Sequence, residues 1–250
     1  MHAQPDADWR AARAFAGPLE LAERFPALTG FAYLRRLPSD TVASWQAAQA
    51  QRPGAAVRVR PIRPGGPPTS DHYVIDWIEP SGQDHLVGLE LSSDPIRWAA
   101  MRQAVETGEV AVTAPLRLAN TERTEYGLLF VLPLYRGGWT PASVAQRWAA
   151  LEGFVVLGVP ALELAREAAL NEARYDWHWV DPEASRAAAA SPPGQPLALD
   201  PPDALPGVAL LDADGHDPTS PVAALLDSGA RAVALGEAIL GQRRYQLGVR

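Results

Sequence analysis

The sequence contains no cysteine and few histidines. Without cysteine the chain has no disulfide, no thiolate metal ligand and no thiol nucleophile. The five histidines, at positions 2, 72, 85, 178 and 216, include no pair at the helical or strand spacing that zinc sites use. We therefore predict that the chain holds no metal ion and no cofactor.

Basic clusters and long apolar runs are also lacking. The net charge is −7 and the arginines are scattered, apart from Arg58, Arg60 and Arg63, whereas a nucleic acid requires clustered positive charge. No segment approaches the ~18 consecutive apolar residues of a membrane-spanning helix, and the N-terminus lacks the pattern of a signal peptide. We therefore predict no nucleic-acid partner and no spanning segment within this sequence.

Catalytic motifs are missing as well. There is no G-x-S-x-G nucleophile elbow, no P-loop and no G-x-G-x-x-G phosphate-binding loop. The stretch DADGHD at 212–217 lacks the ligand series of a calcium loop, and a turn after a strand explains its composition. These absences predict that the chain is not an enzyme.

Apolar periodicity instead predicts an α+β fold, with strand-like and helix-like segments interspersed along 250 residues. Helices are predicted at 5–28, 39–51, 94–108, 144–151, 161–173 and 221–229, with Ser39 as the N-cap of the second. Strands are predicted at 27–37, 57–64, 72–80, 86–91, 110–119, 127–135, 153–159, 175–181, 207–215, 231–240 and 242–250. We expect an antiparallel sheet with inserted helices up to about residue 172, and a smaller domain of similar style after it.

The helix at 94–108 has the clearest boundaries. Asp94 is placed to cap it, Pro95 suits its first turn and Gly108 is placed to end it. Trp98 and Met101 lie on one stripe of this helix.

The two strands after this helix carry unusual residues. Thr113, Pro115, Arg117 and Ala119 share one face of the first strand. The second, at 127–135, is apolar on both faces, which predicts that helices or a ligand cover it on both sides. Two interpretations remain open: the face from Gly127 to Tyr135 lines a pocket in which Thr113 orients a ligand, or the helix at 94–107 fills that space.

Several stretches, taken in order, resemble the CHASE domain, an extracytoplasmic sensor module of bacterial histidine kinases, cyclic-di-GMP enzymes and plant cytokinin receptors. The matching stretches are FPALTGFAYLRRLP, IEPSGQDHLVGLELSSDPIRWAAMRQAVETGEVAVTAPLRL, GLLFVLPLY and GFVVLGV. The elements that carry the resemblance are Pro80, Gly88-Leu89-Glu90, Ala104-Val105-Glu106-Thr107-Gly108, Thr113-Ala114-Pro115-Leu116-Arg117-Leu118 and Pro133-Leu134-Tyr135. Together they span roughly residues 27–159.

The resemblance implies an N-terminal helix followed by two PAS-like domains, each an antiparallel sheet with flanking helices. The helix would be a truncated stalk at 1–28, the membrane-distal ligand-binding domain would span 29–172, and the membrane-proximal domain would span 173–250. It also implies a periplasmic location, transmembrane helices that were trimmed from this sequence, and a homodimer formed through the N-terminal helix.

The resemblance further implies where a ligand would bind. Contacts are expected at Arg97, Trp98, Met101, Thr113, Ala119, Leu129, Val131, Pro133 and Tyr135. The plant receptors read adenine with an aspartate whose position falls on Arg97 or Val131 here. An arginine accepts no hydrogen bond and favours a carboxylate or phosphate, so this departure argues against adenine. The alternative is that Arg97 is a solvated or salt-bridged residue of its helix.

Taken together, the sequence predicts a non-enzymatic sensor ectodomain. It would bind a small molecule, either a cytokinin-like adenine derivative or a small organic acid, and signal through a dimer to a cytoplasmic kinase or cyclase. The alternative is an ectodomain that binds no small ligand and acts by dimerisation or by contact with another protein.

Overall fold

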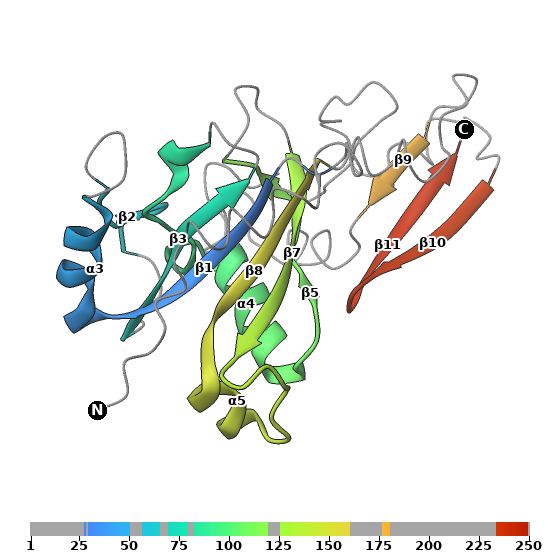
Figure 1. Cartoon of the computed structure of the whole chain (residues 1–250). Coiled ribbons are helices and arrows are strands. Elements are labelled where there is room, and N and C mark those ends of the chain that lie inside the picture. The colour runs from blue at the N-terminus through green and yellow to red at the C-terminus, as the bar shows by residue number, and fades with distance from the viewer. Residues whose placement is uncertain are drawn as a thin grey trace. The chain divides into compact units, whose positions relative to one another are not determined.

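The computed structural model of the chain describes residues 28, 30–50, 57–65, 70–79, 83–119, 126–160, 177–180 and 234–249. These residues form two sheets with helices between their strands, which confirms an α+β fold (Figure 1). Residues 1–27 of the expected N-terminal helix, the helices expected at 161–173 and 221–229 and the strand expected at 207–215 lie outside the described residues.

The chain folds into two compact units. The first unit comprises residues 1–111 and 129–158, and the second comprises residues 112–128 and 159–250. The second unit contains an antiparallel three-stranded sheet with the order β10-β11-β9. Its strands are β9 (Trp177–Val180), β10 (Ala234–Leu240) and β11 (Arg243–Val249). The PAS-like arrangement and the domain boundaries given above stay predictions.

The larger sheet has eight strands in the order β2-β4-β3-β1-β8-β7-β5, with β6 pairing to β7. Its strands are β1 (Gly30–Pro38), β2 (Arg60–Pro61), β3 (Asp71–Glu79), β4 (Leu89–Glu90), β5 (Ala111–Val112), β6 (Leu116–Arg117), β7 (Tyr126–Tyr135) and β8 (Leu151–Pro160). β1 pairs antiparallel with β3 and β8, but β2 pairs parallel with β4. The sheet is therefore mixed, and the expectation of a purely antiparallel sheet was wrong at this edge.

Three predicted strands prove much shorter than expected. In 57–64 only Arg60–Pro61 pairs, because Pro61 and Pro64 have no N–H to donate. In 86–91 only Leu89–Glu90 pairs, between the 3₁₀ turns η3 (Asp84–Leu86) and η4 (Leu91–Ser93). The segment 110–119 divides into β5 and β6 with a bend ahead of Leu116, where Pro115 removes another donor.

Helix α3 (Val42–Gln49) starts later than predicted. A 3₁₀ turn, η2 (Ser39–Thr41), precedes it, so Ser39 is not its N-cap. The Ser39 hydroxyl donates instead to the carbonyl of Ser70, at 2.8 Å. The prediction failed because the first turn is a 3₁₀ turn that includes Ser39, so the α-helix proper begins only at Val42.

An irregularity in the β1–β3 register holds α3 on the sheet. Tyr33 pairs with Trp77 and Leu34 with Ile75, so the register of the two strands skips Asp76. Its carboxylate accepts hydrogen bonds from Arg35 Nε at 2.8 Å, Trp45 Nε1 at 3.2 Å and Gln49 Nε2 at 3.1 Å. Because Trp45 and Gln49 belong to α3, the buried carboxylate ties that helix to the strand.

Helix α4 (Pro95–Thr107) confirms the prediction for 94–108. Asp94 caps it by accepting from the Arg97 amide at 3.0 Å. Gly108 ends it in the left-handed region, with φ +79°, where other residues are strained. A Cβ on Gly108 would also lie 2.7 Å from the Thr140 methyl group, so both the backbone conformation and the lack of space favour glycine here.

Helix α5 (Val144–Ala150) is joined to α4 by a buried arginine. A capping box between Ser143 and Gln146 starts α5. Arg147 Nε then donates to the Val105 carbonyl at 2.7 Å, and Nη1 donates to the carbonyls of Pro141 and Ala142 at 3.1 and 3.2 Å. Its Nη2 donates to the Glu106 carbonyl. One guanidinium therefore joins the last turn of α4 to the loop before α5.

Replacing Arg147 by methionine should lower the free energy of unfolding by about 2–4 kcal/mol, because one buried and three part-buried carbonyls would lose their donor at once. Urea denaturation measures this loss. The matched control is Arg102→Met, since Arg102 has a 58% exposed side chain in a surface ion pair and its removal should cost less than about 0.5 kcal/mol. Equal losses in the two variants would contradict the proposed role of Arg147.

Candidate functional site

The residues expected to contact a ligand divide between the two units. Seven of them lie in the first unit, on α4 and on the part of β7 from Leu129 onward. Thr113 and Ala119 belong to the second unit, where Thr113 is buried and Ala119 is exposed. Because each unit is a body of its own, the candidate site comprises the seven residues of the first unit.

Strand β7 is more fully covered on one face than on the other. The expected contact residues Leu129, Val131, Pro133 and Tyr135 alternate along it and are all buried. On the opposite face Phe130 and Leu134 are half-buried, and Leu132 is 40% exposed. The expectation that both faces are fully covered therefore holds only for the face that includes Val131.

The expected contacts on α4 differ in burial. Arg97 and Met101 are buried, and Trp98 is half-buried. The ring of Trp98 lies between two other rings, with its centroid 5.6 Å from that of Tyr73 on β3 and 6.0 Å from that of Trp148 on α5. Tyr73 in turn contacts Phe154 on β8 at 5.3 Å, so a chain of four aromatic rings packs α4 and α5 onto the sheet.

Arg97 is neither solvated nor alone. Its side chain is 8% exposed, and Nη1 lies 3.3 Å from Oδ1 of Asp94. The other oxygen of Asp94 accepts from Arg63 Nε at 2.8 Å. The buried carboxylate thus lies between two guanidinium groups while also capping α4, which is the salt-bridged alternative that the sequence left open for Arg97.

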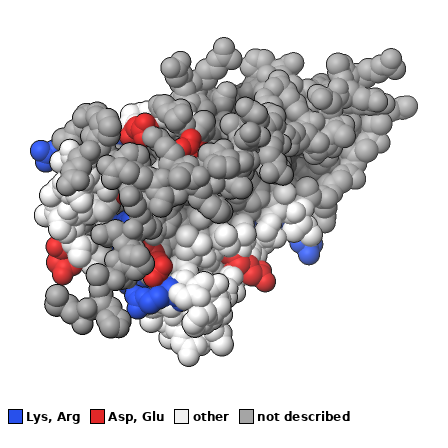
Figure 2. Space-filling view, in the orientation of Figure 1, with Lys and Arg blue, Asp and Glu red and all other residues white. Residues whose placement is uncertain are grey.

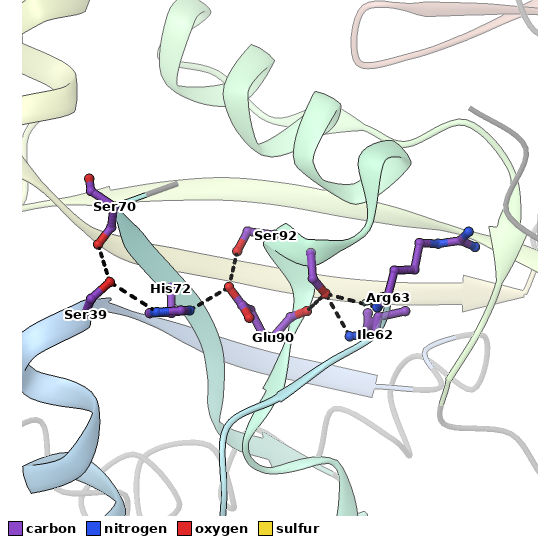
Figure 3. A network of polar contacts seen from close by, with 8 residues as sticks. Ser39, Ile62, Arg63, Ser70, His72, Glu90 and Ser92 are labelled. Carbon is purple, nitrogen blue, oxygen red and sulfur yellow. Dashed lines mark hydrogen bonds and ion pairs between the residues drawn. The ribbon is translucent and has the colours of Figure 1, made fainter. Parts of the chain in front are cut away.

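A network of polar side chains continues from this point along β4 and η4 (Figure 3). The Ser93 hydroxyl accepts from the Ile62 amide at 2.7 Å and donates to the Glu90 carbonyl at 2.6 Å. The Glu90 carboxylate accepts from the Ser92 hydroxyl at 3.1 Å, and its Oε1 lies 2.8 Å from Nδ1 of His72. The segment 90–94 therefore joins β3, α4 and the residues after β2.

His72 extends the network to η2. Its Nε2 lies 3.3 Å from the Ser39 hydroxyl, which gives the order serine, histidine, glutamate (Figure 3). In a nucleophilic triad the serine gives its hydrogen to the imidazole. Here the Ser39 hydroxyl gives its hydrogen to the Ser70 carbonyl at 2.8 Å, so it does not give it to the imidazole as a nucleophilic serine would. We interpret this group as a structural network that joins η2 to β4.

Sequence reasoning missed this network because its members come from distant segments. Val74 pairs with Glu90 across β3 and β4, and that pairing brings the His72 ring to the carboxylate. No spacing within the sequence reveals such a pairing. The Asp94–Arg97 contact, by contrast, follows from the i, i+3 spacing of an N-cap residue and a basic residue one turn later.

Three tyrosines lie in environments that disfavour ionisation. Burial raises the pKa of Tyr73 to about 12, and burial also raises the pKa of Tyr33 and of Tyr135. The charge of Arg147 acts in the opposite direction on Tyr135. The Tyr135 hydroxyl is buried without a hydrogen-bond partner. Ionising it would therefore place a negative charge in a buried position where no donor stabilises it.

Within the part of the chain that the structure describes, no cluster of three or more histidine, aspartate and glutamate side chains is arranged to hold a metal ion. None of the described helices is both long enough and apolar enough to cross a membrane.

Comparison with protein families gives a match. The model of the CHASE domain matches residues 5–190, which is well over half of the chain. A search of curated proteins finds none that matches the chain.

The raised pKa of Tyr73 predicts a loss of stability at alkaline pH. An exposed tyrosine titrates near ~10, so the stabilisation of the neutral phenol is complete below that pH and is lost as pH rises toward about 12. The chain has no lysine, so tyrosines dominate titration in this range. The urea concentration at the midpoint of unfolding should fall between pH 8 and pH 11, and this fall should be smaller in Tyr73→Phe than in the parent protein. Identical falls would show that Tyr73 makes no contribution.

Replacing Glu90 by glutamine tests the polar network. The substitution removes the negative charge of the carboxylate that His72 and Ser92 contact, but keeps its shape. The free energy of unfolding should therefore fall by about 1–2 kcal/mol at neutral pH. Glu106→Gln is the matched control, because the Glu106 side chain is 51% exposed. If urea denaturation shows equal stabilities for the two variants, the network does not stabilise the fold.

Proposed function

The chain belongs to the CHASE domain family, whose members are extracytoplasmic sensor domains, and on this basis we propose that its first unit binds a small anionic molecule. The observation that carries the proposal is the burial of Arg97 on α4, which also carries the half-buried Trp98 and the buried Met101. A buried guanidinium is a strong and directional partner for a carboxylate or a phosphate group.

The chemistry of Arg97 favours an organic acid over a cytokinin-like adenine derivative. Reading the amino edge of adenine needs an acceptor, and the guanidinium has only donors. In the structure the Asp94 carboxylate already contacts Arg97, with Oδ1 lying 3.3 Å from Nη1. An anionic ligand would therefore compete with Asp94 for the same guanidinium, and binding would be coupled to the N-terminal cap of α4.

Such coupling gives a route for the signal. A ligand that binds more tightly to one arrangement of Asp94, Arg97 and Arg63 shifts the population of molecules toward that arrangement. Helix α4 and the segment after β2 would move with it, because Arg97 and Arg63 share the Asp94 carboxylate. We propose that this shift passes through a homodimer formed by the N-terminal helix to a kinase or cyclase in the cytoplasm. The domain itself performs no reaction in this proposal.

A second function is favoured by a specific observation. Met101 and Val131, two central members of the expected contact set, are each 1% exposed, so protein atoms already enclose them. A domain filled in this way acts as an interaction or dimerisation module that needs no small ligand. The two proposals differ in whether a small molecule stabilises the folded chain.

A thermal-shift series with acetate, succinate, inorganic phosphate and adenine separates them. An anion present at a concentration about 100-fold above its Kd stabilises the folded state by about 2.7 kcal/mol, which raises the melting temperature by several degrees. Arg97→Lys should weaken the response to carboxylates, because lysine lacks the bidentate geometry. Asp94→Asn should strengthen it, because asparagine still caps α4 but no longer competes for Arg97.

Arg102→Met is the control for this series, since its exposed side chain lies on the same helix. It should respond as the parent protein does. The anion-binding proposal would be contradicted if no anion raised the melting temperature, or if the melting temperatures of all variants rose equally. A response to adenine alone would overturn the argument based on Arg97.

A further inference from the structure

The carboxylate of Asp94 is bound in the way that an acidic ligand would be bound. Arg63 Nε donates to its Oδ2 at 2.8 Å. Its Oδ1 accepts from the Arg97 amide at 3.0 Å and lies 3.3 Å from Nη1 of the same arginine. The two oxygens of one planar acid group are therefore divided between two arginines that come from different segments of the chain.

Arg63 is the most accessible member of this group. Its side chain is 19% exposed, compared with 8% for Arg97 and 1% for Asp94, so a molecule from solvent reaches Arg63 more readily than Arg97. On the face shown in Figure 2, the described acidic and basic side chains are interspersed and do not gather in a basic patch. That face offers no field that would attract an acid by charge alone, which leaves recognition to individual arginines.

The backbone that carries Arg63 is tied to the residue before Asp94. The Ser93 hydroxyl accepts from the amides of Ile62 and Arg63 at 2.7 and 3.4 Å, and it donates to the Glu90 carbonyl at 2.6 Å (Figure 3). A guanidinium on a segment held in this way keeps its place when the Asp94 side chain turns away. Little further ordering is then needed for it to bind another acid group.

We infer, as a step that rests on the anion-binding function proposed above, that Arg63 is a second recognition residue of that site and that its ligand is a carboxylate. The carboxylate replaces Asp94 between the two guanidinium groups, because it offers the same two oxygens in the same plane. A phosphate group is tetrahedral and places further oxygens outside that plane. The buried surroundings of Asp94 leave little room for them.

Titration calorimetry with acetate tests the role of Arg63 in a background that lacks its carboxylate partner. In Asp94→Asn the side-chain oxygen still caps α4, but an NH₂ group replaces the oxygen that Arg63 contacts. Adding Arg63→Met to this variant should weaken acetate binding at least ~10-fold, as loss of a hydrogen bond to a charged group does. If Arg63 only held Asp94 in place, the second substitution would leave the affinity for acetate unchanged.

Arg58→Met, also added to Asp94→Asn, is the matched control. Arg58 is an exposed arginine of the same segment, so its loss removes an equal charge and should leave acetate binding unchanged. Equal weakening by Arg58→Met and Arg63→Met would overturn the role of Arg63, because net charge alone would then explain both. Inorganic phosphate, titrated in the same way, should bind more weakly than acetate. Far-ultraviolet circular dichroism confirms that each variant folds.

The remaining outcomes distinguish this inference from the function on which it rests. Acetate binding that is weakened by Arg97→Lys but not by Arg63→Met, each in the Asp94→Asn background, overturns the role of Arg63 and leaves anion binding in place. Phosphate that binds as tightly as acetate, or more tightly, overturns the assignment of a carboxylate. A chain that binds neither anion in any variant overturns the anion-binding function and this inference together.

Discussion

The carboxylate of Asp94 is the point on which the arrangement of the first unit depends. It caps α4 through the Arg97 amide and lies against two guanidinium groups, one on the helix and one on the segment after β2. Taking a carboxylate out of water is costly, and the cost is offset only while its partners stay in place. The start of α4, the residues after β2 and the side chain of Arg97 therefore hold their positions together.

The other end of α4 is fixed by a buried charge of the opposite sign. Arg147 donates to carbonyls of the last helical turn, where the helix dipole is negative, and to the loop that follows β7. A helix held at both ends by charged groups has little freedom to slide along the sheet. Its middle part, which includes Met101 and Ala104, is accordingly packed tightly against the core. Any displacement of this helix therefore has to break the contacts at one of its two ends.

Much of this fold follows from local sequence, and the rest follows from contacts that no local pattern shows. α4 was predicted with its cap, its proline and its terminal glycine, because these signals act within one helical turn. Long strands such as β3 and β7 were also predicted, whereas the two-residue strands β2 and β4 were overestimated, since proline and 3₁₀ turns interrupt their pairing. Within the site, Arg97 was singled out on family resemblance. The partnership of His72 with Glu90 was not foreseen, because only the pairing of β3 with β4 brings the two side chains together.

The extra residue in β3 has a consequence for how the sheet forms. Asp76 reaches Trp45 and Gln49 only when β1 and β3 are aligned as observed, with one residue of β3 skipped. A shift of the pairing by one residue would turn this carboxylate toward the opposite side of the sheet and leave α3 without its anchor. A chain that pairs its central strands out of register therefore loses the contacts of α3 as well, which widens the free-energy gap between the observed alignment and a shifted one.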